Sequence, residues 1–289
     1  MLLFASLIIL LILAVFLYMR QPKFGKKPSK ERLEILKRSP QFSNGKFQNI
    51  SHTPTLTEGY TMWGLIYEQL FKVHPNRTPN SSLPSVATNL FDLDLNENAL
   101  VWFGHSSYYM QLEGKRFLID PVLSGNASPV PGSVKAFKGT NPYSVEQLPE
   151  IDYLLISHDH YDHLDYETII GLKNKVDTII CGLGVGSHFE YWGFQPEKIM
   201  EKDWNETFML SDNITIRTTS ARHFSGRGFV RNNTLWLSYV VETPSQKIFV
   251  GGDSGYDSHF AEIGKKHGPF DLAILENGQY NLAWEAIHM

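Results

Sequence analysis

Short apolar runs alternate with polar turns over the central and C-terminal parts of the chain, a pattern that is typical of β-strands. It predicts strands at Ala99–Phe103, Tyr108–Leu112, Arg116–Ile119, Tyr153–Ile156, Thr178–Ile180, Thr207–Leu210, Ile214–Thr218, Leu235–Val241, Ile248–Val250 and Leu272–Leu275. Apolar residues at helical spacing predict helices at Lys30–Lys37, Tyr60–Val73, Tyr166–Leu172, Gly186–Trp192 and Ser258–Lys266. Because the strands follow one another as meanders and hairpins with few helices between them, we expect two sheets packed face to face with helices outside.

The first nineteen residues form a continuous apolar run without a charged side chain. At about 1.5 Å per residue, a helix of this length is about long enough to cross a hydrocarbon core of roughly 30 Å, so we expect a membrane helix at 1–19. A cleaved signal peptide is the alternative, but no basic residue precedes the run and no small-x-small cleavage site follows it. Cations gather directly after the run, at Arg20, Lys23, Lys26, Lys27, Lys30 and Arg32. By the positive-inside rule they predict a single-pass anchor with the following domain in the cytoplasm.

Composition limits the kind of chemistry that the rest of the chain can carry. The sequence has 289 residues, 42% of them hydrophobic, which is enough for one large core or two lobes packed as one unit. The formal net charge is -4 and no long basic run is interleaved with aromatic residues, so nucleic acid is not an expected partner. Cys181 is the sole cysteine, which excludes an internal disulfide and thiolate-rich metal sites. Any metal must therefore be held by histidines and carboxylates.

Three histidines and an aspartate lie within six residues, in the run His158-Asp159-His160-Tyr161-Asp162-His163. The run follows an expected strand, so the two-residue spacing of His158 and His160 points both imidazoles to the same side, where they can bind one ion. Asp162 and His163 follow where the loop turns into a helix that Asp165 is placed to cap, and they can face a second ion. The alternative is a charged surface loop whose histidines meet by coincidence, and the density of ligand-type residues argues against it.

Further ligands are expected at other strand ends. His223 lies just past the strand 214–218, Asp253 follows the strand 248–250 within a Gly-Gly-Asp-Ser-Gly segment, and His288 lies beyond the strand 272–275. His105, in a Gly-His-Ser-Ser turn, can either line the pocket or orient a ligand, or else serve packing or backbone bonding. His188 and His259 fall on expected helices and are predicted to lie on the surface. Cys181, at the end of an apolar strand, is predicted to be a buried structural thiol.

These residues carry a family resemblance. The run HDHYDH matches the HxHxDH signature of the metallo-β-lactamase superfamily, and the later order of His, Asp and His matches as well. The chain most resembles the branch that contains N-acylphosphatidylethanolamine-hydrolysing phospholipase D. The segments that carry this closer likeness are Phe24-Gly25 near Pro22, Trp102-Phe103-Gly104-His105-Ser106-Ser107, Leu118-Ile119-Asp120-Pro121, Asp203-Trp204, Ala221-Arg222-His223 and Gly252-Asp253-Ser254-Gly255-Tyr256.

The resemblance implies an α/β fold, an αββα sandwich, over 98–289, with 20–97 as a juxtamembrane linker and N-terminal extension. It also implies two divalent metal ions, most simply zinc, although His and carboxylate ligands suit iron or manganese too. One ion would take His158, His160 and His223, and the other Asp162, His163 and His288. Asp253 would bridge the two ions, and Asp120 would support a ligand from behind.

Such a pair of ions makes a Ser or Cys nucleophile unnecessary, because a bridging water with a pKa near neutrality attacks as hydroxide. Asp162 and Asp253 are then the catalytic carboxylates. The leading hypothesis is a membrane-anchored zinc phosphodiesterase that acts on phospholipids as a phospholipase D. A lactonase with the same site is the first alternative, and a non-catalytic membrane protein with a structural metal site is the second.

The resemblance departs from the family at its end. In the family, an acidic-proline-type segment and further chain follow the last metal histidine, whereas here only Met289 follows His288. We therefore expect that the C-terminal part is truncated and that the second metal site is the weaker of the two.

Overall fold

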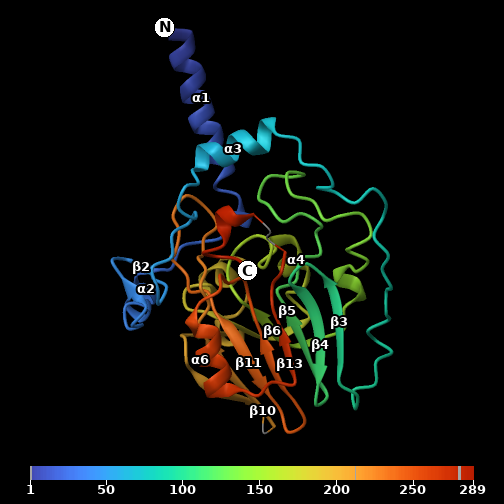
Figure 1. Cartoon of the computed structure of the whole chain (residues 1–289). Helices are drawn as coiled ribbons and strands as arrows, with labels where there is room; N and C mark the ends of the chain where they lie inside the picture. Colours follow the sequence, from blue (N-terminus) through green and yellow to red (C-terminus); the bar gives the residue numbers. More distant parts are fainter. Residues whose placement is uncertain (1, 212, 279–280) are drawn as a thin grey trace.

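Two β-sheets face each other in the computed structural model, which describes residues 2–211, 213–278 and 281–289 (Figure 1). The six-stranded sheet has the order β3-β4-β5-β6-β7-β8, with β3 Ala99–Gly104, β4 Ser107–Leu112, β5 Lys115–Ile119, β6 Ile151–Ile156, β7 Val176–Gly182 and β8 Ile199–Lys202. The five-stranded sheet has the order β13-β12-β11-β10-β9, with β9 Thr207–Ser211, β10 Ile214–Thr219, β11 Ser238–Glu242, β12 Lys247–Val250 and β13 Leu272–Ile274. A separate hairpin pairs β1 Phe42–Ser43 with β2 Lys46–Phe47.

The connections between strands are only partly the predicted meanders. Strands β3 to β5 and β9 to β12 pair antiparallel with their neighbours, as predicted. Strands β5 to β8 instead run parallel, and so do β12 and β13. A parallel pair needs a crossover, and α4 Tyr166–Gly171, α5 Gly186–Tyr191 and α6 Ser258–His267 supply it for β6–β7, β7–β8 and β12–β13. The fourth crossover, between β5 and β6, is the segment 120–150, which contains a short 3-10 turn. Three of the four parallel pairs are therefore connected through helices that the sequence predicts.

Alternating side chains along the strands divide the interior into layers. In β6, Tyr153 and Leu155 belong to the core between the two sheets, whereas Leu154 and Ile156 belong to a cluster on the outer face that includes residues of α4 and α5. On the outer face of the other sheet, Ile263 of α6 packs with Val240 and Phe249. The order is helix, sheet, sheet, helix, which confirms the predicted αββα sandwich.

The sole cysteine lies inside this outer cluster. Cys181 of β7 has no exposed surface, and burial raises the pKa of its thiol well above the ordinary value. It is a buried thiol, as predicted.

The N-terminal segment begins with α1 Leu2–Tyr18 and continues with α2 Lys30–Leu36 and α3 Met62–Phe71. Leu36 and the hairpin residue Phe47 are fully buried and belong to the same hydrophobic cluster as the residues between the sheets. Short 3-10 turns complete the described elements, namely η1 Pro22–Phe24, η2 Val145–Gln147, η3 Pro196–Lys198 and η4 Leu282–Trp284. The predicted membrane helix at 1–19 is not supported, because α1 covers 17 residues and no helix in the described part of the chain is long and apolar enough to cross a membrane.

One buried hydroxyl ties the sheets together just before the run of predicted ligands. The Tyr239 hydroxyl of β11 lies 2.7 Å from the carbonyl oxygen of Ile156 and 2.9 Å from that of Ile180. We expect Tyr239→Phe to lower the free energy of unfolding by about 1–2 kcal/mol, because it leaves buried carbonyls without their donor. Urea denaturation measures the change. The exposed Tyr60 provides the control, for which Tyr60→Phe should change stability by less than about 0.5 kcal/mol.

Candidate metal centre

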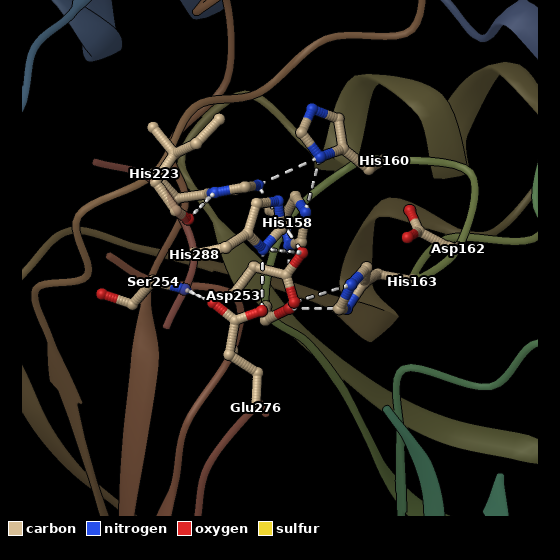
Figure 2. Close-up of polar contacts among 12 residues, drawn as sticks. His158, His160, Asp162, His163, His223, Asp253, Ser254, Glu276 and His288 are labelled. Carbon is tan, nitrogen blue, oxygen red and sulfur yellow. Dashed lines mark hydrogen bonds and ion pairs between the residues drawn. The ribbon is translucent and has the colours of Figure 1, made fainter. Parts of the chain in front are cut away.

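Several strands end at one edge of the sandwich, and polar residues follow them there. Strands β10 and β12 are both antiparallel to β11, and β13 is parallel to β12, so all three point the same way. His223, Asp253 and Glu276 follow these three strands, and the run 158–163 follows β6 of the other sheet. Figure 2 shows the labelled imidazoles gathered around Asp253, with Asp162 to one side.

Three of the histidines form one close group. His158 Nε2 lies 2.8 Å from His160 Nδ1, and His223 Nε2 lies 3.2 Å from the same atom. Their ligand atoms all lie within 4.8 Å of one another. The structure therefore brings together the three histidines that the resemblance assigns to a single ion.

Asp253 lies between this group and the remaining predicted ligands. Its Oδ1 is 3.2 Å from His163 Nε2, and its Oδ2 is 3.7 Å from both His223 Nε2 and His288 Nδ1. Glycine before it permits this position, because a Cβ on Gly252 would lie 2.7 Å from the Cβ of Ser157. The loop after β12 can thus approach the end of β6 closely enough for Asp253 to contact both sets of imidazoles.

The other predicted ligands group differently from the set expected for the second ion. Within the described residues, Asp162 and His163 form a close group with His105, whereas His288 groups with His223 and Asp253. The His105 imidazole lies 3.1 Å from Asp162 Oδ2, and its side chain, 53% exposed, lines a cavity of about 620 Å³. Of the roles left open for His105, its position favours lining the pocket.

Asp120 supports His163 from behind. Its Oδ1 accepts a hydrogen bond from the Ser157 backbone N–H at 2.8 Å, and its Oδ2 accepts from the Ser157 hydroxyl and lies 2.8 Å from His163 Nδ1. Asp120 is 1% exposed. With Nδ1 held in this way, the Nε2 atom of His163 faces Asp253.

The similarity to known proteins agrees with this geometry. Residues 115–289 match a family described as Beta-lactamase superfamily domain. An uncharacterized protein of Mycobacterium tuberculosis is 38% identical over 256 residues, which make up 88% of this chain and 68% of that protein. The chain belongs to the metallo-β-lactamase superfamily.

Other members of the metallo-β-lactamase superfamily extend the comparison. N-acyl-phosphatidylethanolamine-hydrolyzing phospholipase D 1 of Caenorhabditis elegans is 33% identical over 198 residues, covering 63% of this chain and 54% of that enzyme. The solved structure of Igni18, a metallo hydrolase from Ignicoccus hospitalis, is 19% identical with a TM-score of 0.50 and covers 63% of this chain and 72% of its own, which supports the fold alone. Together, the family match and the close His and Asp groups identify a metal-dependent hydrolase.

The electrostatics favour the metal-binding protonation state over part of the site. Burial lowers the pKa of His158 and His160, and it lowers the pKa of His223 to about 3. Burial also opposes a charge on Asp253, but the neighbouring histidines, above all His163, hold the pKa of this carboxyl well below its usual range. Neutral imidazoles and ionised carboxylates are the forms that donate lone pairs to a metal ion. Against the effect of burial, neighbouring carboxylates raise the pKa of His163 and of His288.

One atom of the site lies where a ligand atom would be expected. His163 Nε2 is buried and makes no well-aligned hydrogen bond among the described residues, although Asp253 Oδ1 lies 3.2 Å away and Asp120 holds the other ring nitrogen. Burial of a polar atom without a hydrogen bond costs about 1–3 kcal/mol, and coordination to an ion would offset that cost. Imidazole nitrogens and carboxylate oxygens suit zinc, iron or manganese. The residues therefore fit the divalent ions that the metallo-β-lactamase superfamily implies.

Two histidines are not where the helical patterns place them. The prediction that His188 and His259 lie on the surface is wrong, because both are buried. His188 Nε2 lies 3.1 Å from Asp159 Oδ2, and its Nδ1 accepts a hydrogen bond from the backbone N–H of Lys26. His259 Nε2 lies 3.1 Å from the Ser254 hydroxyl. A short helix pattern cannot show that a distant segment of chain covers the face on which a histidine lies.

Asp159 helps to hold the ligand run in place, a role that the HxHxDH motif does not indicate. Its carboxylate accepts hydrogen bonds from the Gly226 backbone N–H at 2.6 Å and from the Thr234 hydroxyl at 2.9 Å, in addition to its contact with His188. The signal was available, because a residue between two ligands on an extended backbone must point to the opposite side. Asp165 occupies the predicted N-cap position of α4, but its side chain makes no capping bond. It bonds the Thr168 hydroxyl and the Ser124 N–H instead of a helix N–H.

Arg227 holds the ligand loop to the N-terminal segment. It is buried, and its guanidinium donates to the carbonyl oxygens of Asp159 at 2.9 Å, Leu164 at 2.7 Å and Lys23 at 2.7 Å. The same group lies 4.1 Å from the centre of the Tyr161 ring. One side chain thus contacts two residues within the run 158–163 and the residue directly after it.

We expect Arg227→Met to lower the free energy of unfolding by about 3 kcal/mol, since buried hydrogen bonds from a charged group are lost together. Urea denaturation of the metal-free protein measures this without a contribution from bound ions. Arg38 is exposed, so Arg38→Met should stay within about 0.5 kcal/mol of wild type. Equal effects of the two replacements would contradict the role given to Arg227.

Proposed function

We propose that this protein is a zinc-dependent phosphodiesterase that acts on phospholipids in the manner of a phospholipase D. The observation that carries the proposal is Asp253, a carboxylate within 3.7 Å of histidines from both sides of the site, at a cavity large enough for a substrate headgroup. Relatives in Caenorhabditis elegans and Saccharomyces cerevisiae that are named as N-acyl-phosphatidylethanolamine-hydrolyzing phospholipases D support the lipid class. The chain covers 54% and 40% of these two relatives.

In this proposal His158, His160 and His223 hold one zinc ion, Asp162, His163 and His288 hold the other, and Asp253 lies between them. Two such ions, when bound, would activate a water molecule near neutral pH and stabilise the oxygens of an in-line displacement at phosphorus. Asp162 and Asp253 are the proposed catalytic carboxylates. Both keep a lowered pKa although burial opposes their charge, because histidines lie beside them.

Two kinds of side chain line the cavity. The predicted ligands Asp162, Asp253 and His288 line it together with His105. Apolar side chains of β3 and of the β13 region also line it; we call them the apolar wall, and they are Leu100, Trp102, Leu272, Ile274 and Leu275. A phosphodiester at the polar residues could place an attached acyl chain against the apolar wall, where burial is favourable. This lining supports a lipid over a small polar phosphodiester.

Two exposed apolar helices support access from a lipid surface. No residue of α3 is buried, and Trp63 and Phe71 are 81% and 71% exposed. Figure 1 shows α3 lying beside the base of α1, whose leucine and isoleucine side chains from Leu3 onward are exposed as well. Contiguous exposed apolar surface of this kind is typical of an interaction site. We propose that α3 contacts the membrane that holds the substrate.

The assignment is tested with the full chain, solubilised in detergent and loaded with zinc, on N-acylphosphatidylethanolamine. Phosphatidic acid is the expected product. Asp253→Asn should lower the rate by more than about 100-fold, because losing a ligand costs more than the 10–100-fold typical of its supporting groups. Asp177→Asn, at an exposed aspartate, is the matched control and should retain the wild-type rate.

A substrate panel separates the alternatives. Cleavage of lactones without cleavage of phosphodiesters would overturn the phospholipid assignment and leave a hydrolase of the same superfamily. Two bound ions with no turnover of either class would favour a structural metal site.

The membrane contact has its own test. We expect Trp63→Asp to lower the rate on substrate in phosphatidylcholine vesicles at least about tenfold, because an aromatic side chain contributes about 1.5–3 kcal/mol when it leaves water. The rate on a short-chain monomeric analogue should not change. Met209 of β9 is 64% exposed, and Met209→Asp should affect neither rate. A fall in both rates for Trp63→Asp would argue against a membrane contact at α3.

A further inference from the structure

Glu276 is an acidic residue of the site that the ligand pattern does not include. It follows β13 by two residues, its side chain is 9% exposed, and it lines the same cavity as Asp162, Asp253 and His288. Figure 2 shows its carboxylate directed toward Asp253, Ser254 and His288. A buried carboxylate is stable only with donors around it, so its partners reveal its role.

The carboxylate joins three segments of chain. Its Oε1 accepts hydrogen bonds from the backbone N–H of Ser254 at 2.8 Å and from that of Met289 at 3.2 Å. Its Oε2 lies 2.7 Å from Nδ1 of His288. The end of β13 is thereby bonded both to the loop that carries Asp253 and to the segment that carries His288.

Those two segments are also packed directly on each other. A Cβ on Gly255 would lie 2.2 Å from the carbonyl oxygen of Ala286, so only glycine allows the contact. Ile287 is buried, and its carbonyl oxygen lies 2.9 Å from Nδ1 of His223. The backbone of the two segments that Glu276 joins is therefore fixed. The orientation of the His288 ring then depends on the group that contacts its Nδ1 atom.

Glu276 determines which nitrogen of His288 carries the lone pair. An ionised carboxylate only accepts hydrogen bonds, so Nδ1 of a neutral imidazole beside it must be the N–H, which leaves the lone pair on Nε2. Asp120 does the same for His163, whose Nδ1 it holds at 2.8 Å while Nε2 faces Asp253. Metal-binding histidines commonly donate their second ring N–H to such a carboxylate.

We propose that Glu276 is a positioning residue for His288, which it holds in the tautomer and orientation that bind the second ion. The inference rests on the proposed two-metal function and names a supporting residue for its second site. Glu276 acts through His288 and does not itself contact the substrate.

The test is the zinc affinity of the full chain carrying Glu276→Gln, measured by competition with a chelating dye. An amide cannot accept from Ser254, Met289 and His288 together, because one of its two heavy atoms is a donor. We expect one of the two ions to bind about 10–100-fold more weakly, and the other to bind as in wild type. Glu285 is exposed and close in sequence to His288, so Glu285→Gln is the matched control and should bind both ions normally.

A double replacement separates positioning from other roles. If Glu276 acts through His288, Glu276→Gln should cause no further loss of affinity in a His288→Ala protein. Wild-type affinity in Glu276→Gln, or an equal loss in both backgrounds, would overturn the inference. The melting temperature of each metal-free variant reports folding. If Glu276→Gln does not fold, Glu276→Asp is measured in its place, because the shorter carboxylate cannot reach all three donors. Wild-type zinc affinity in Glu276→Asp would also overturn the positioning role of Glu276.

The wild-type protein distinguishes this inference from the function on which it rests. Wild-type protein that binds fewer than two ions would overturn the two-metal proposal, and the role of Glu276 with it. If the wild-type protein binds two ions and hydrolyses a phosphodiester, and Glu276→Gln binds zinc with wild-type affinity, only the role of Glu276 is overturned and the proposed function stands.

Discussion

The carboxylate of Asp120 joins the ends of two neighbouring strands, and the geometry of the site depends on that junction. It accepts hydrogen bonds from the backbone and the hydroxyl of Ser157, directly before His158, and it holds His163 at the other end of the ligand run. Its own N–H donates to the carbonyl of Leu155. The residue has a φ of +41°, a left-handed conformation that costs a non-glycine residue about 1–2 kcal/mol. A residue keeps such a strained conformation when several surrounding contacts hold it, as the hydrogen bonds of Asp120 do.

The opposite side of the ligand run is held by a second set of contacts. Asp159 binds His188, Gly226 and Thr234, while Arg227 binds the backbone of the run and of Lys23. The segment before the sandwich is therefore part of the support of the site. The same N-terminal segment also contributes Leu36 and Phe47 to the hydrophobic core, where both are fully buried. Imidazoles that repel one another when charged need such a frame, because their own interactions do not hold them together.

The parts of this arrangement that are local in sequence could be predicted from the sequence. His158 and His160 share a side because extended backbone alternates, and apolar residues mark the strands that precede His223 and Asp253. Contacts between distant segments could not be predicted in this way. His188 is buried because residues near Lys26 cover it, and Glu276 acquires its partners from two loops that β13 alone does not specify. Strand β8, whose side chains are all only half-buried, lacks the apolar run that would indicate it.

The burial of Cys181 makes the chain convenient to label. Its thiol has no exposed surface and a raised pKa, so thiol reagents will not reach it while the sandwich is folded. A cysteine placed at an exposed position would then be the accessible thiol in the native protein. Fluorescent or spin probes on α3, or beside the cavity, could then follow lipid binding and ion loading without first removing a native cysteine.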